Sequence, residues 1–147
     1  MEYLLVTIAV LILIGSISIA IPSKASRKIS RIRMDAKLLG CKISSNLYGE
    51  NKFKNSSEFS VSYSIKNHTN LKEAHFIRDK TELILYSPVK LKYSDSFESL
   101  NEELQNISNS LEEVIFTSVS ISFLWKELDG LDELKEIIKN FDKLKKF

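Results

Sequence analysis

The sequence predicts an α+β protein in which an N-terminal transmembrane helix precedes a small antiparallel sheet covered by two helices. Residues 3–21 carry no charged side chain. Segments 59–65 and 119–125 alternate apolar and polar residues, which is the period of a strand with one buried face. Segments 96–111 and 131–147 instead repeat their apolar residues at helical spacing. Because an apolar sheet face is buried against amphipathic helices, we expect these segments to form two packed layers.

The transmembrane anchor is assigned to residues 1–23. As a helix, the uncharged residues 3–21 would span about 28 Å, close to the roughly 30 Å hydrocarbon core of a bilayer. A cleaved signal peptide is the alternative, with a cleavage site at residues 18–20. Signal peptides have a basic N-terminal region and an apolar run of about 7–15 residues, whereas this run is longer and follows Met1 and Glu2. We therefore favour an uncleaved span.

A set of basic residues follows the span, and we call it the basic collar. Its members are Lys24, Arg27, Lys28, Arg31, Arg33 and Lys37. Because positive charge flanking a span stays in the cytoplasm, we expect the N-terminus outside and the domain on the cytoplasmic side of the cell inner membrane. The same charges favour contact with anionic membrane lipid. Residues 24–39 also place apolar residues on one helical face, which predicts a basic juxtamembrane helix that ends at Gly40.

The part of the chain after the collar is slightly acidic. Once the collar, Glu2 and Asp35 are set aside, 15 basic and 17 acidic residues remain for residues 38–147. Nucleic-acid binding requires clustered lysine and arginine, so this balance argues against a nucleic-acid partner. Cys41 is the single cysteine and cannot form an intramolecular disulfide, which is compatible with a reducing compartment.

Residues 40–147 are expected to form one α+β domain. Its predicted elements are a strand starting at 41–43, a loop at 45–57, a strand at 59–65, a hairpin of 73–78 and 82–87, a helix at 97–110, a strand at 119–125 and a helix at 131–147. Asp79-Lys80 forms the hairpin turn, and Pro88 ends its second strand. The acid pairs Glu102-Glu103 and Glu112-Glu113 lie on or beside the helix at 97–110, so we expect them to face solvent.

The chain carries little that indicates catalysis. Its two histidines, His68 and His75, lie in a predicted turn and a predicted strand, and a zinc site needs closer pairs or more Cys and His partners. Cys41 has no flanking nucleophile motif, and four glycines in the chain provide no glycine-rich phosphate loop. We therefore expect no metal, no cofactor and no catalytic residue. A small membrane-tethered enzyme that uses Cys41 or a histidine is the alternative.

Two sets of residues are candidates for contact with a partner. Phe59, Tyr63, Phe123 and Trp125 are expected to line one side of the sheet. A hydrophobic core is the first interpretation of these aromatic residues, and a partner groove beside an edge strand is the second. In the span, Ser16 and Ala20 form a small-xxx-small pair that would let two helices approach closely. A homodimer through the span is therefore a further hypothesis.

The stretches MDAKLLGCKI and SVSISFLWKE, behind a leading span and a basic stretch, resemble a group of uncharacterised single-pass inner-membrane proteins of gammaproteobacteria. The resemblance covers most of the chain and implies a membrane anchor without implying an activity. The layout is also remotely similar to that of YajC, the accessory subunit of the Sec preprotein translocase. Residues 21–23, Ile-Pro-Ser, stand where that family has Arg-Pro-Gln, and the domain is longer, so this likeness concerns layout alone.

These patterns together favour a membrane-anchored, non-enzymatic interaction or accessory protein of the bacterial inner membrane. Its expected partner is another membrane protein or a cytoplasmic protein. A signal-anchored domain that faces outward is a third hypothesis, after the tethered enzyme.

Overall fold

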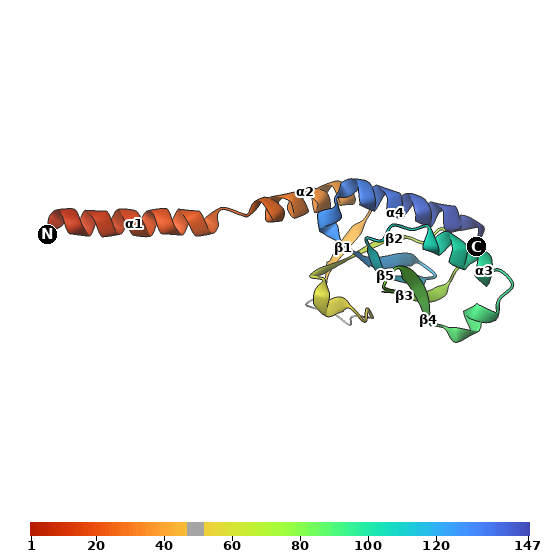
Figure 1. The fold of residues 1–147 in the computed structure, drawn as a ribbon. Helices are drawn as coiled ribbons and strands as arrows, with labels where there is room; N and C mark the ends of the chain where they lie inside the picture. The colour runs from red at the N-terminus through yellow and green to blue at the C-terminus, as the bar shows by residue number, and fades with distance from the viewer. Residues whose placement is uncertain (47–51) are drawn as a thin grey trace.

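The computed structural model describes residues 1–46 and 52–147 and shows a long N-terminal helix followed by an α+β domain. Helix α1 (Glu2–Ala20) extends away from the domain, whereas α2 (Lys24–Leu38) lies against it (Figure 1). The two helices are separate because the backbone is extended at Ile21 and Ser23. The Ser23 hydroxyl then accepts a hydrogen bond from the Ser26 N–H at 3.1 Å and caps α2.

In the described residues, six strands form one antiparallel sheet in the order β1-β2-β6-β5-β3-β4. Their bounds are β1 Lys42–Ser45, β2 Val61–Lys66, β3 Glu73–Asp79, β4 Glu82–Ser87, β5 Leu111–Thr117 and β6 Ser120–Trp125. The strand signals at 41–43, 59–65, 73–78, 82–87 and 119–125 all correspond to strands, with ends shifted by one or two residues. Residues 47–51 of the predicted loop at 45–57 lie outside the described residues.

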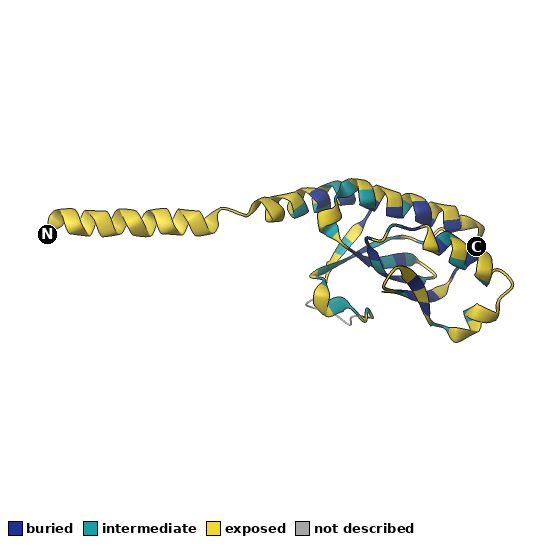
Figure 2. Ribbon diagram, viewed as in Figure 1, coloured by how far each residue is buried: buried dark blue, intermediate teal, exposed yellow. Residues whose placement is uncertain are grey.

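One face of the sheet is covered by α2, α3 (Phe97–Gln105) and α4 (Leu131–Lys143), as Figures 1 and 2 show. Their buried apolar residues are Ile32 and Ala36 in α2, Leu100 and Leu104 in α3, and Leu134, Ile137 and Phe141 in α4. Short 3-10 turns occur at η1 Ser56–Glu58, η2 Val89–Tyr93, η3 Glu127–Asp129 and η4 Leu144–Lys146. The juxtamembrane segment 24–39 therefore packs with the domain at 40–147 and belongs to its helical layer.

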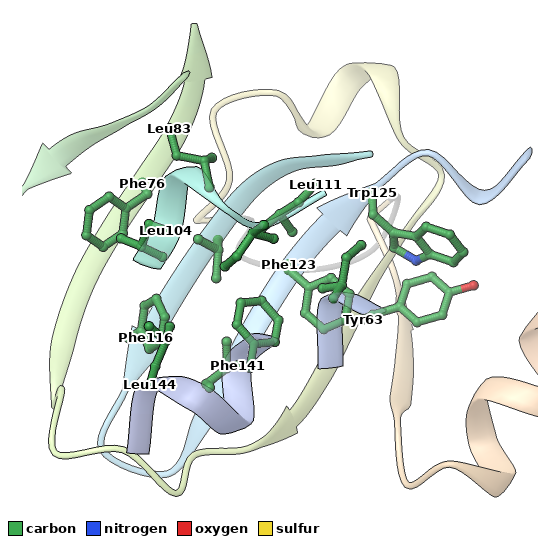
Figure 3. Packing of buried hydrophobic residues seen from close by; sticks show 14 of the residues in the cluster. Tyr63, Phe76, Leu83, Leu104, Leu111, Phe116, Phe123, Trp125, Phe141 and Leu144 are labelled. Atoms are coloured by element: carbon green, nitrogen blue, oxygen red, sulfur yellow. The ribbon is translucent and has the colours of Figure 1, made fainter. Parts of the chain in front are cut away.

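Aromatic residues form the centre of the core. Tyr63, Phe123, Val114 and Phe76 are cross-strand neighbours in a row over β2, β6, β5 and β3, and each is at most 1% exposed. Phe141 of α4 packs edge-on against Phe123 with ring centres 5.4 Å apart (Figure 3). Such edge-to-face pairs are favourable beyond the area that they bury, so this row joins the sheet to α4.

The helix expected at 97–110 ends at Gln105, and the chain then forms strand β5, which the sequence pattern does not reveal. β5 carries apolar residues at the consecutive positions 114–116, so its sequence lacks the alternation of a half-buried strand. A β-bulge between Leu111 and Glu113 interrupts the period further. The expectation that Glu112-Glu113 faces solvent is therefore wrong for Glu113, which is 0% exposed.

The edge strand β4 is capped by a side chain at one position. Gln105, at the end of α3, accepts a hydrogen bond from the Leu83 N–H at 3.3 Å and donates one to the Leu83 carbonyl at 3.1 Å. The Gln105 amide thus occupies both backbone groups that an added strand would use at this residue.

We expect Trp125→Ala in the full chain to lower the free energy of unfolding by about 3–5 kcal/mol, because it removes a buried indole from the core. Urea unfolding in detergent micelles, followed by circular dichroism, measures this change. Val119→Ala is the control, since Val119 is 72% exposed and its truncation should change the unfolding free energy by less than about 0.5 kcal/mol. Equal effects of the two substitutions would contradict the assignment of Trp125 to the core.

Candidate functional site

Helix α1 carries apolar side chains on all sides and buries none of its residues (Figure 2). Within residues 1–46 and 52–147, one helical stretch, which begins at Glu2, is long and apolar enough to cross a membrane. The hydroxyls of Thr7, Ser16 and Ser18 each donate to the carbonyl four residues earlier, at 2.7–2.9 Å. These polar groups are therefore satisfied inside the helix, as an apolar environment requires. Ser16 and Ala20 lie exposed on one face of α1, and the contact between two spans stays a prediction.

An ion pair fastens α2 to the domain. The Nε and Nη2 atoms of Arg33 donate to the two carboxylate oxygens of Glu127 at 2.7 and 2.9 Å. Arg33 Nη2 also donates to Ser60 Oγ at 3.2 Å, and the Tyr63 hydroxyl donates to Glu127 Oε1 at 2.6 Å. We call Arg33, Ser60, Tyr63 and Glu127 the docking cluster. Its bidentate, charge-assisted geometry links α2 to β2 and η3.

Burial and charge fix the protonation states of the docking cluster. The side chains of Arg33 and Glu127 are 31% and 14% exposed. The hydrogen bond with Glu127 raises the pKa of the Arg33 guanidinium. Burial, together with the hydrogen bond to Glu127, raises the pKa of the Tyr63 hydroxyl. Tyr63 is therefore a neutral donor and Arg33 a cation throughout the physiological pH range.

The basic collar divides into two sets. Arg33 belongs to the docking cluster, and Lys28 Nζ donates to the Leu128 carbonyl at 2.8 Å. The remaining collar residues are exposed, and they are Lys24, Arg27, Arg31 and Lys37. Part of the collar thus holds α2 on the segment at 127–128, while the rest keeps its charge in solvent.

Three of the four predicted aromatic contact residues belong to the core. Tyr63, Phe123 and Trp125 are 1%, 0% and 1% exposed, so they are not available as an open groove. Phe59 is half-buried and lies with Trp125 along a hollow of about 400 Å³ between α2 and η3.

The indole nitrogen of Trp125 is buried without a hydrogen-bond partner among the described residues. The indole packs edge-on against the Tyr63 ring, with ring centres 5.5 Å apart. Figure 3 shows the nitrogen on the side of the indole that faces this ring.

Glu113 forms a buried polar site on the sheet face opposite the helices. His75 Nε2 of β3 lies 2.5 Å from Glu113 Oε1 of β5. The backbone N–H groups of Lys54 and Asn55 donate to the two carboxylate oxygens at 2.8 and 2.9 Å. The Glu113 carboxylate therefore ties β3, β5 and the segment before η1 together.

The charge of Glu113 is stabilised despite its burial. Burial alone would raise the pKa of this carboxyl group. The hydrogen bonds from His75 and from the N–H groups of Asn55 and Lys54 outweigh burial, and the pKa is lowered below its ordinary value. An imidazole held by an ionised carboxylate is also the arrangement of a general base. His75 completes this site by packing against Tyr86, with ring centres 5.0 Å apart.

Sequence reasoning missed the Glu113–His75 site. It placed both Glu112 and Glu113 in solvent. Glu112 is half-buried, with a carboxylate oxygen 3.1 Å from Lys126 Nζ. Glu113 is fully buried on the sheet face opposite the helices. No signal in the local sequence separates the two residues, because the bulge after Leu111 decides which of them becomes buried.

Cys41, the candidate nucleophile, and His68, a candidate metal ligand, lie apart from the Glu113–His75 site. Cys41 is 4% exposed, and burial raises the pKa of its thiol to about 11, so it is a poor nucleophile at neutral pH. His68 lies in the turn between β2 and β3 and borders a different hollow from the one beside Phe59. In the part of the chain that the structure describes, no three His, Cys, Asp or Glu side chains are grouped to hold a metal ion.

Comparison of the chain with protein-family models, with curated proteins and with solved structures found no match. The residues and contacts described above are therefore the basis for a functional proposal.

We expect a double-mutant cycle of Arg33→Ala and Glu127→Ala to give a coupling energy of about 1–3 kcal/mol, because the pair is bidentate and half-shielded from water. Urea unfolding of the full chain and its three variants measures the coupling. The control cycle is Asp142→Ala with Lys145→Ala. That pair is more than half exposed and should couple by at most about 0.5 kcal/mol. Equal coupling in the two cycles would rule out the docking role of Arg33.

We expect Glu113→Gln to reduce the acid sensitivity of folding. The carboxyl group has a lowered pKa in the folded state, so its stabilisation is complete above the unfolded pKa of about 4.3 and is lost as pH falls through the folded value. The parent protein should thus lose stability steadily below about pH 5. The variant should be less stable at pH 7, by about 1–3 kcal/mol, with a shallower decline in acid. Urea unfolding between pH 3 and 7 tests this, and an unchanged pH profile would contradict it.

Proposed function

We propose that this protein is a single-pass inner-membrane protein that holds a non-enzymatic interaction domain at a fixed distance from the bilayer. The observation that carries the proposal is α1, a 19-residue helix with no buried residue. Only residues 21–23 separate it from α2, which is packed on the domain. An apolar helix joined so closely to a folded domain is the arrangement of an anchored module.

Exposure of α1 to water would be unfavourable along its whole length. Leu4, Leu5 and Val6 are 61%, 67% and 62% exposed, and as consecutive residues they lie on different sides of the helix. Monomeric soluble proteins rarely present a continuous apolar surface of this extent. Insertion into a bilayer removes that apolar surface from water along the whole length of the helix.

The exposed part of the collar supports a cytoplasmic domain. Lys24, Arg27, Arg31 and Lys37 follow the apolar helix and keep their side chains in solvent. Positive charge close to the end of a span favours the cytoplasmic side, so the N-terminus lies outside in this proposal. Lys24 and Arg27, the members nearest the span, are free to meet anionic lipid headgroups near the membrane surface.

The docking cluster supports a fixed distance between domain and bilayer. Ile32 and Ala36 are buried against the domain, and Arg33 is bound to Glu127. The domain therefore follows the direction of α2, and bending between anchor and domain is confined to residues 21–23. Because only three residues join the two helices, a domain held in this way stays close to the membrane surface.

A membrane-tethered enzyme is the second candidate, and the Glu113–His75 pair is the observation that favours it. His75 would be the general base and Glu113 the carboxylate that orients it. Cys41 does not suit the nucleophile role because its thiol is buried and its pKa is raised. Loss of complementation of a deletion strain by a stably folded His75→Gln variant would favour the enzyme over the interaction module.

We expect the full chain to stay with the membrane after extraction with alkaline carbonate, and a chain without residues 1–23 to be released. A cytoplasm-dependent reporter fused after Phe147 should be active, whereas an export-dependent reporter there should be silent. Glutamate at Lys24, Arg27, Arg31 and Lys37 should weaken this orientation, because it removes the positive flank.

The control for the reporter experiment reverses four exposed lysines of the domain, at Lys66, Lys72, Lys90 and Lys92. This control should keep the parental orientation. Activity of the export-dependent reporter in the parent would assign the outward-facing alternative. A mature chain that lacks its first twenty residues would assign the cleaved signal peptide.

A further inference from the structure

A groove with a mixed apolar and polar lining runs between the end of α2 and the C-terminal half of α4. It consists of two adjoining hollows of about 280 and 200 Å³, which share Leu39, Ile138 and Asp142 as lining residues. Ile65 of β2 and Phe141 of α4 extend the apolar lining of the larger hollow. We call this feature the α2–α4 groove.

Lysines border the α2–α4 groove. Lys66 lies at the end of β2, and Lys135 and Lys139 lie one turn apart on α4. All three are exposed. The carboxylate that lines both hollows, Asp142, lies 3.2 Å from Lys145 Nζ, so its charge is already paired. The rim is therefore positive, although residues 38–147 as a whole carry more acids than bases.

We infer that the α2–α4 groove docks an acidic, amphipathic segment of a partner protein. Apolar side chains of that segment fill the two hollows, and its carboxylates face Lys66, Lys135 and Lys139. An apolar centre with a charged, solvent-exposed rim is the usual anatomy of a protein-recognition surface. The complementary charge supplies orientation and speeds association, while the hollows supply the buried contact.

The choice of a protein over a lipid rests on the proposed function. Helix α2 has 15 residues, so Leu39 lies about 22 Å along the helix axis from Lys24. Figure 1 shows α2 running on from α1 in nearly the same direction. With α1 in the bilayer, the groove is then farther from the headgroups than the roughly 8–10 Å over which their charge acts. A protein segment, unlike a headgroup, reaches that height.

The test selects peptides on the intact protein. The full chain in neutral phosphatidylcholine nanodiscs is presented to a displayed library of random 16-residue peptides. We expect the enriched peptides to combine several Asp or Glu residues with two or more large apolar residues. The tightest of them is then labelled with fluorescein, and its Kd is measured by anisotropy on the parent and the variants.

Two groove variants and one matched control make the test specific. Leu39→Asp, at a residue that is 43% exposed, and the triple reversal of Lys66, Lys135 and Lys139 to Glu should each raise the Kd at least about tenfold. The control reverses three exposed lysines elsewhere, at Lys72, Lys90 and Lys92, and should change the Kd less than about twofold. Thermal unfolding of each variant confirms that it is folded.

Several results would overturn the inference. They are enrichment of peptides without acidic character, equal loss of binding in the control and groove triples, or displacement of the peptide by soluble dihexanoylphosphatidylglycerol at the groove. Self-association of the parent that Leu39→Asp abolishes would assign the groove to a second copy of the chain. Carbonate extraction measures the anchor independently, so failure of the membrane proposal and failure of the groove inference give different results.

Discussion

The pairing of Arg33 with Glu127 is the contact on which the arrangement of this molecule depends. Without it, the Tyr63 hydroxyl would lose its acceptor at the edge of the core, and α2 would be held by the burial of Ile32 and Ala36 and by the hydrogen bond from Lys28 to the Leu128 carbonyl. Because the pair is bidentate, it fixes the rotation of α2 as well as its position. The exposure of the remaining collar residues follows from that fixed rotation. Helix α2, the inward part of the collar and the core are thus joined through the docking cluster.

Periodicity was sufficient to predict the elements whose two faces differ. The hairpin of β3 and β4, strands β2 and β6, and the amphipathic α4 each present one apolar face, and each occurs where the pattern indicates. The apolar face of the juxtamembrane helix was equally visible, since Ile32 and Ala36 lie on it. The surface against which this helix packs was not visible in the sequence, because a periodic pattern indicates that a face is buried but does not indicate which surface buries it. Arg33 was therefore assigned to the collar with its neighbours, although it belongs to a contact 94 positions away in the chain.

Strand β5 and Glu113 show where local patterns fail for a physical reason. Strand β5 has consecutive apolar residues at 114–116 and so shows no simple alternation, and the bulge after Leu111 shifts the period within it. A buried carboxylate is expensive unless its oxygens are satisfied. Here the donors come from His75 and from backbone groups at 54 and 55, which are 38 to 59 positions distant. Such a site is specified by tertiary structure as a whole, and no short segment of the sequence contains it.

The capping of β4 by Gln105 has a consequence for the protein among its own copies. Proteins tethered to a membrane share a thin layer, which raises their effective concentration with respect to one another far above the average in the cell. An open strand edge in such a layer would meet identical edges repeatedly and in similar orientations, which are the conditions for edge-to-edge assembly. By binding both backbone groups of Leu83, Gln105 blocks the pairing of another strand at the second residue of β4. In a protein anchored as proposed, this amide would hinder edge-to-edge pairing through β4, whereas β1 forms the other edge of the sheet.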